Sequence, residues 1–260
     1  MNQDLANLVQ WLRANKISLN ASKTEIILFK NQRKNITKNL NFRLSGQKIK
    51  LSSHVKYLGL ILDENLTWDK QMHNLTLKFI LAKLCHYLDY KTILSVYYAL
   101  FDSHINYFLP NLGYTTVENL NKIELLQKKA LRIIHFKSNM DTCKPLFVKS
   151  RILPINKQVA LKNCLFAYDF LHNRLPSYFR NFLQKSGENH NHATRASTNC
   201  LDITRTNSNS VRYGTYNLAN LISKNWNNFY AKVKVDYQQV SKPTFKHHLH
   251  SFILTELAST

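Results

Sequence analysis

Glycine is scarce in this chain of 260 residues, which contains only 5 of them. No two glycines lie closer together than Gly46 and Gly59, so the glycine-rich loops of dinucleotide-binding and P-loop proteins are excluded. The 4 cysteines form no C-x-x-C pair, which excludes a zinc knuckle or zinc ribbon. No apolar run approaches the roughly 20 residues of a transmembrane helix, and the polar start of the chain is unlike a signal peptide. We therefore expect an intracellular protein with reduced thiols, in the nucleus, the cytoplasm or both.

Acidic side chains are also few, because 15 Asp+Glu stand against 36 Lys+Arg and leave a formal net charge of +21. Hydrophobic residues make up 44% of the chain, so it can bury a core and is not a disordered basic tail. The basic excess is seven charges in residues 1–65, six in residues 66–151 and eight in residues 152–260. This surface favours a polyanionic partner, with nucleic acid first and an anionic membrane second. The even spread argues against a membrane, which would need a strongly segregated amphipathic helix.

The first 65 residues are predicted to form a small β-rich unit. Apolar residues at helical spacing predict a helix over residues 3–15. Short strands are expected at residues 25–29, 39–44 and 48–51, the last two as a tight hairpin around Ser45-Gly46. Residues 55–62 are apolar on both faces and predict a single buried strand. Together these strands would make one small sheet.

Beyond residue 65 the apolar pattern becomes helical. Helices are predicted over residues 69–88, 91–103, 117–136, 154–173, 176–184, 216–230 and 241–257. Residues 91–103 are apolar nearly all round, so this helix is expected to be central. The fold class is therefore α+β and predominantly helical. We divide the chain into a β-rich unit (1–65), a helical domain (66–185), a long polar loop (186–215) and a C-terminal helical region (216–260).

The predicted helix at residues 117–136 has two different faces. Its apolar residues share one face with Gln127, and the rest of its surface is strongly basic, with Lys122, Lys128, Lys129, Arg132 and Lys137. A solvated amphipathic face and a phosphate-binding face explain this pattern equally well from the residues alone.

Four stretches follow one another in order: WLRANKISLNASKTEIILF (residues 11–29), VKYLGLILDENLTW (55–68), LNKIELLQKKALRII (120–134), and RTNSNSVRYGTYNLANLISKNWNNF (205–229) with PTFKHHL (243–249). They resemble motif D, motif E, a thumb helix and the region after the thumb in the reverse transcriptases of non-LTR (LINE-like, jockey-like) retrotransposons. The resemblance covers nearly the whole chain. It implies a palm-edge remnant in residues 1–65 and a thumb-like domain in residues 66–185.

The resemblance also implies roles for individual residues. Lys23 matches the basic residue of motif D, where a lysine near the incoming nucleotide can neutralise leaving pyrophosphate; in this chain we expect an ordinary surface lysine. Tyr57, Leu58 and Gly59 match the motif E turn that grips the primer. The four basic residues of the 117–136 helix, with Lys137 directly after it, would form the side of the thumb that tracks an RNA–DNA hybrid through charge and shape.

The chain departs from that family in its acidic residues. The family's metal-binding turn is an aromatic-Ala-Asp-Asp sequence ahead of motif D, whereas this chain has no Asp-Asp pair, and Asp63-Glu64, its only adjacent acidic pair, should be structural. Two-metal phosphoryl transfer needs carboxylates that hold two divalent ions. We therefore expect no catalytic residue, metal site or cofactor in this chain, although an intact parent enzyme would need Mg²⁺.

Two functional hypotheses follow. The first is a truncated RNA-directed DNA polymerase that binds RNA template and DNA primer but lacks the upstream palm and fingers. The alternative is a stand-alone, non-catalytic RNA- or DNA-binding module derived from a mobile element. Other chemistry-bearing residues favour neither a nuclease nor a zinc site: His190-Asn191-His192 lacks the ββα context of a nuclease, and His247 and His250 have no evident third ligand.

Overall fold

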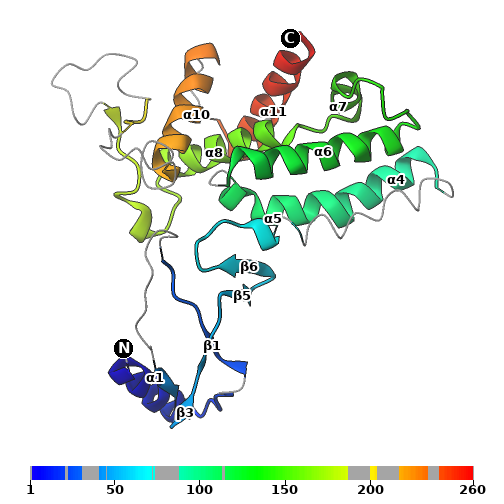
Figure 1. Cartoon of the computed structure of the whole chain (residues 1–260). Helices are drawn as coiled ribbons and strands as arrows, with labels where there is room; N and C mark the ends of the chain where they lie inside the picture. The colour runs from blue at the N-terminus through cyan, green and yellow to red at the C-terminus, as the bar shows by residue number, and fades with distance from the viewer. Residues whose placement is uncertain are drawn as a thin grey trace. The chain divides into compact units, whose positions relative to one another are not determined.

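A computed structural model describes residues 2–20, 23–30, 41–44, 46–71, 73, 88–112, 115–186, 200–203, 217–233 and 240–259. The chain divides into two compact units, residues 1–74 and residues 75–260, and each is described by itself. The structure is mostly helical, and its named strands all lie in the first unit (Figure 1). This confirms the predicted α+β, mainly helical class. The finer four-part division stays a prediction.

The first unit combines an N-terminal helix with three two-stranded ladders, and a further helical segment begins at Asp69. Helix α1 spans Asn2–Ala14, as predicted. The ladders join β1 (Glu25–Ile26) to β4 (Lys50–Leu51) in parallel, and β2 (Arg43–Leu44) to β3 (Gln47–Lys48) and β5 (His54–Tyr57) to β6 (Leu60–Asp63) in antiparallel fashion. The prediction of one small sheet was therefore wrong for the described residues. Leu5 and Val9 of α1 pack against the small core formed by Phe42, Leu44 and Ile49.

Two tight turns shape this unit. The predicted hairpin around Gly46 is confirmed, because Leu44 pairs with Gln47 and Gly46 has a φ of +84°. The single buried strand predicted at residues 55–62 is wrong, since the chain reverses at Leu58-Gly59 and its two halves pair with each other as β5 and β6. The physical reason is Gly59, whose φ of +87° is readily adopted by glycine and lets a continuous apolar run turn back on itself.

The second unit is a bundle of helices (Figure 1). Its first segment is continuous and consists of α4 (Tyr90–Tyr97), the π-helical turn η2 (Tyr98–Asp102) and α5 (Ser103–Leu112). The bundle continues with α6 (Val117–Ile134), α7 (Lys144–Ser150), α8 (Ile155–Leu171), the 3₁₀ turn η3 (Ser177–Phe179), α10 (Leu218–Val233) and α11 (Lys242–Ser259). Only a 3₁₀ turn forms where a helix was predicted at residues 176–184. The helix predicted at residues 69–88 lies mostly outside the described residues.

The central helix is α8 rather than the segment at residues 91–103. The latter buries a single face, which includes Ile93, Tyr97 and Phe101, while Tyr98 and Leu100 are exposed. Helix α8 instead buries nine of its residues and contacts α5, α6, α10 and α11. The prediction failed because an apolar composition all round a helix does not say how many neighbours cover it.

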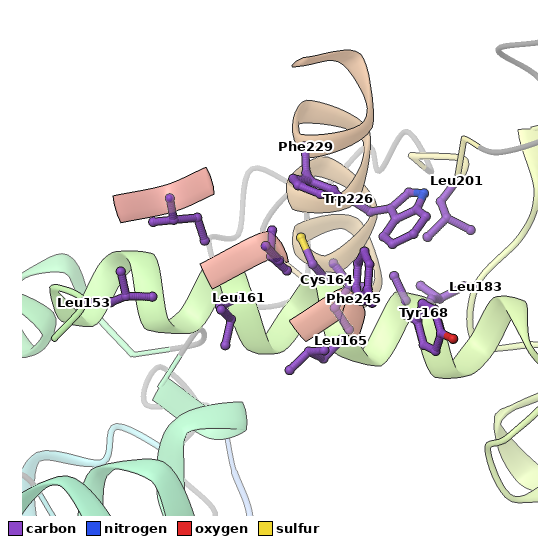
Figure 2. Close-up of a cluster of buried hydrophobic side chains, with 14 of the residues drawn as sticks. Leu153, Leu161, Cys164, Leu165, Tyr168, Leu183, Leu201, Trp226, Phe229 and Phe245 are labelled. Atoms are coloured by element: carbon purple, nitrogen blue, oxygen red, sulfur yellow. The ribbon is translucent and has the colours of Figure 1, made fainter. Parts of the chain in front are cut away.

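A large hydrophobic core lies where α10 and α11 pack on α8 (Figure 2). Its centre is Phe245, which is fully buried and stacks on Tyr168 with 4.7 Å between ring centroids. Trp226 and Phe229 of α10 contact the same phenylalanine ring at 5.9 and 5.8 Å. Burial of aromatic rings of this size is a major source of stability, to which tilted and offset contacts add.

A short piece of the predicted polar loop belongs to this core. Leu201 is 1% exposed, and Asn227 of α10 holds its backbone by accepting from Leu201 N (2.9 Å) and donating to Leu201 O (2.7 Å). Residues 184–186 pair with residues 200–202 through two further backbone hydrogen bonds. The loop is thus closed at its base, whereas residues 187–199 and 204–216 lie outside the described residues.

Gln127 joins α6 to the start of α8. Its side chain is fully buried, as predicted from the sequence; Oε1 accepts from Ile155 N at 2.8 Å and Nε2 donates to Leu153 O at 3.3 Å. The first amides of a helix have no partner within the helix, so α8 obtains one from a side chain of α6.

We predict that Gln127→Leu lowers the free energy of unfolding of the second unit by about 1–3 kcal/mol, because a buried amide loses its acceptor at nearly constant side-chain volume. Urea unfolding in a Trp11→Phe/Trp68→Phe background, in which Trp226 is the remaining tryptophan, measures this change by fluorescence. The control is Asn121→Leu on the exposed side of the same helix, which should change stability by less than about 0.5 kcal/mol. A Gln127→Leu variant as stable as this control would contradict the bridging role.

Candidate nucleic-acid interface

Helix α6 gathers four of the predicted phosphate contacts on its exposed side. Thr116 caps its N-terminus by accepting from Asn119 N (3.3 Å), and Ile123, Ala130 and Ile134 lie on its buried face. The cations project from the rest of the helix surface, and Lys137 follows its C-terminus. We call this set the basic strip (Lys122, Lys128, Lys129, Arg132 and Lys137).

Two acidic residues of α6 partly balance the charge of the basic strip. Lys122 pairs with Glu118 at 2.9 Å and Lys128 with Glu124 at 2.7 Å, both across one helical turn. Such exposed pairs contribute only about 0.3–0.5 kcal/mol, so a phosphate can replace the carboxylate at little cost. Lys129, Arg132 and Lys137 have no ion pair with any described residue, and they supply the unbalanced positive charge.

Arg132 has a positioning contact as well as a charge. Its Nε donates to Asp141 O at 3.1 Å, which holds the segment after α6 close to the helix. The helix ends at Ile134, Phe136 follows with a φ of +53°, and Lys137 N donates to Arg132 O at 2.8 Å. Lys137 is therefore kept next to the end of the helix by backbone geometry.

The sequence pattern did not indicate three exposed apolar side chains that lie on or beside the basic strip. Leu125 is 57% exposed, Phe136 65% and Met140 94%. The helical pattern alone could have found Leu125, because it falls between Lys122 and Lys129 on the basic side. Phe136 was expected inside the helix, and only the backbone turn places it in solvent.

The predicted primer-grip residues lie at the tip of the β5–β6 hairpin. Leu58 and Gly59 both have positive φ values, +47° and +87°, between the paired residues Tyr57 and Leu60. Two such residues in a two-residue loop make a type I′ turn, which matches the twist of the flanking strands. We call Tyr57, Leu58 and Gly59 the hairpin tip; its two large side chains are 62% and 70% exposed.

Leucine is an unusual residue at the first position of such a turn. A left-handed conformation costs a non-glycine residue roughly 1–2 kcal/mol, and asparagine or glycine usually occupies this position. The hairpin tip therefore combines strain with apolar exposure, a combination found at surfaces that bind a ligand.

Asp63 fixes the base of this hairpin. Its carboxylate is buried and accepts from Asn65 N (3.1 Å), Thr67 N (2.9 Å) and Trp68 N (2.7 Å). Burial alone would raise the pKa of Asp63, but the hydrogen bonds from these backbone amides outweigh it and hold the pKa below the usual 3.8. Its neighbour Glu64 pairs with Lys30 at 3.2 Å. Both acids thus have structural roles, as expected.

Lys23 lies apart from any catalytic arrangement among the described residues. It is exposed in a single turn ahead of β1, and its backbone N donates to Asn20 O and to the Asn20 side chain, each at 3.2 Å. The surface lysine expected from the sequence fits this position.

No group of three or more His, Cys, Asp or Glu residues in the described part of the chain could hold a metal ion. Cys143 and Cys164 are buried, and burial raises the pKa of Cys164 to about 12. Cys85, His190 and His192 lie outside the described residues. Within the described ranges, no helix is both long and apolar enough to cross a membrane.

We predict that Asp63→Asn lowers the free energy of unfolding of the first unit by about 1–3 kcal/mol, because an amide cannot accept at both positions. Since the pKa of Asp63 is lower in the folded state, its contribution is complete above the unfolded value of 3.8 and is lost as pH falls through the folded value. Hydrogen exchange of residues 54–71 between pH 2 and pH 6 measures this. Glu64→Gln is the control, and a wild-type pH dependence retained in Asp63→Asn would contradict the assignment.

Comparison with known proteins gives no assignment, since no family model, curated protein or solved structure matches this chain. The basic strip and the hairpin tip are therefore interpreted from their own chemistry.

Proposed function

We propose that this chain is the C-terminal part of a non-LTR retrotransposon reverse transcriptase and that it holds RNA template and DNA primer without catalysing polymerisation. The observation that carries the proposal is the basic strip, a cationic surface along a rigid helix. Lys122 and Arg132 are ten residues apart and thus about 15 Å apart along the helix axis. That distance covers about four phosphates of one strand, which rise roughly 3.4 Å per nucleotide in B-form DNA.

The chemistry of the basic strip suits a backbone rather than a base sequence. Lysine ammonium groups attract phosphates as point charges and carry no sequence information. The exposed Leu125 and Phe136 beside them can contact sugars or unpaired bases, as apolar and aromatic side chains do in single-strand binding proteins. Together these groups favour a primer–template surface that accepts any sequence.

The hairpin tip supports the same function in the first unit. Its tight turn presents Tyr57 and Leu58 on a short, hydrogen-bonded ladder, so the side chains are exposed while their backbone is held. An aromatic ring and an aliphatic side chain in this position can pack against a ribose or a terminal base. Motif E of the polymerase family that this segment resembles uses a turn of this kind on the primer strand.

We predict that the purified chain does not extend a DNA primer on an RNA template in the presence of Mg²⁺ or Mn²⁺, because its sequence contains no Asp-Asp pair. A gel-based extension assay with an active reverse transcriptase as the positive control measures this. Extension that co-purifies with the chain and is lost in Lys129→Gln/Lys137→Gln would overturn the non-catalytic part of the proposal.

We predict that the chain binds an RNA–DNA hybrid with an affinity that falls as salt rises, and that Lys129→Gln/Lys137→Gln reduces the slope of log K against log salt by about 1 for each lysine. Fluorescence anisotropy with a labelled hybrid at four salt concentrations measures this slope.

Lys224→Gln is the matched control, because Lys224 is an exposed lysine of α10 outside the basic strip. The control should show the wild-type slope of log K against log salt. Affinity independent of salt, or equal losses in the control and the double variant, would show that the basic strip is not the binding surface.

A further inference from the structure

A pocket of about 300 Å³ lies within the second unit, between the η2–α5 segment, the linker ahead of α8, α8 itself and α11. Its charged lining residues are Arg151, Lys162, Lys246, His250 and Asp102. None of its lining residues belongs to the basic strip, so it is a separate feature. We call it the interhelix pocket.

Cations outnumber acids around the interhelix pocket. Arg151, Lys162 and Lys246 form no ion pair with any described residue, although ion pairs occur at Lys157 of α8 and Lys242 of α11. Neighbouring cations that face one pocket repel each other, and a bound anion would remove that repulsion.

The pKa shifts of two lining residues agree with this crowding of positive charges. Burial lowers the pKa of Lys162, and the charges of Lys246 and Lys242 lower it further, against a smaller opposing effect of Asp102. Burial also lowers the pKa of His250, and Arg151, Lys246 and His247 add to that shift. Both groups would be stabilised in their charged forms by a negative ligand.

Hydrogen-bond acceptors also line the pocket. Burial raises the pKa of Asp102, and hydrogen bonds from Gln158 and Asn106 oppose that rise. Gln158 is 8% exposed and its Nε2 donates to Leu153 O at 2.8 Å, but its buried Oε1 has no hydrogen-bond partner among the described residues. A buried amide oxygen without a donor is costly, and a ligand hydroxyl or amino group would satisfy it.

A π-helical turn carries the aromatic residue of the pocket. Ser103 N donates to Tyr98 O, five residues earlier, so η2 is wider than a regular helical turn. Such turns occur often at functional sites. Tyr98, at its start, lines the pocket and is 42% exposed, so part of its ring is available for stacking.

We propose that the interhelix pocket binds a nucleoside phosphate. Arg151, Lys162 and Lys246 would hold the phosphate together with the His250 imidazole. Asp102 and the Gln158 Oε1 would accept from sugar hydroxyls or base amino groups, and Tyr98 would stack on the base. The volume of about 300 Å³ is at the lower end for ligand pockets and suits a single nucleotide. That nucleotide is either free or the phosphorylated end of a strand; the proposal does not depend on the basic strip.

The test is isothermal titration of the full chain with AMP, with adenosine and inorganic phosphate as partial ligands. We expect saturable binding of AMP and at least tenfold weaker binding of either part alone. Lys162→Gln and Lys246→Gln should each weaken AMP binding by about tenfold, as expected from the loss of a charge-assisted hydrogen bond. Lys224→Gln and Lys129→Gln/Lys137→Gln should bind AMP as the wild type does, which separates the pocket from the proposed hybrid-binding surface.

Two further measurements distinguish the source of the nucleotide and control for misfolding. If the natural ligand is a strand end, a short RNA with a 5′-phosphate should bind more tightly than its 5′-hydroxyl form, and this difference should disappear in Lys162→Gln. Equal binding of both RNAs together with tight AMP binding indicates a free nucleotide. In the wild type, the pKa of His250 followed by NMR should rise when AMP binds. The proposal would be overturned if AMP showed no saturable binding and the 5′-phosphate had no effect. It would also be overturned if inorganic phosphate bound as tightly as AMP, or if the pocket variants kept wild-type affinity.

Discussion

The second unit depends on the enclosure of helix α8. Nine of its residues are buried, on more than one side, so a single neighbouring helix cannot cover it. Helices α5, α6, α10 and α11 supply the cover, and Gln127 of α6 supplies the acceptor that the first amide of α8 needs. The same neighbouring helices therefore cover the buried residues of α8 and provide a hydrogen-bond partner at its N-terminus. The basic side of α6 and the interhelix pocket owe their positions to this arrangement, because both lie on helices that pack against α8.

Exposed features in both units are held by polar side chains that bond to backbone groups. Asp63 accepts three amide hydrogen bonds behind the β5–β6 hairpin, Arg132 donates to a carbonyl after α6, and Asn227 both accepts from and donates to the backbone of Leu201. Each bond of this type contributes modestly, but leaving its buried partner unsatisfied costs more. Side chains that face solvent, such as Leu58 and Lys137, can thus be displayed in defined places without being part of a core.

Sequence patterns were sufficient where a segment's own periodicity decides its structure. Helices α1, α6, α8, α10 and α11 lie close to their predicted bounds, and the glycine at position 46 marked its hairpin. The pattern failed at residues 55–62, where Gly59 lets a continuous apolar run reverse and form the β5–β6 hairpin. The five cations of the basic strip were identified in advance, because helical spacing brings four of them together and Lys137 follows directly after the helix. The interhelix pocket was not, because its lining residues come from segments as distant as Tyr98 and His250 and meet only in the folded bundle.

The basic strip and the interhelix pocket both carry part of the net charge of +21, but their charges lie in different dielectric surroundings. The basic strip is exposed, so its charges are screened over about 8 Å at physiological ionic strength and suit contact with a long phosphate backbone at low specificity. In the interhelix pocket Lys162 and His250 are partly buried, so their repulsion by the neighbouring exposed cations Arg151 and Lys246 is screened less. Repulsion of that kind disfavours folding unless a compensating charge enters, whereas repulsion along the strip is relieved by solvent ions and by Glu118 and Glu124. A bound anion would therefore stabilise the pocket more than the strip, and this difference in dielectric surroundings distinguishes the proposed small-ligand site from the proposed backbone-binding surface.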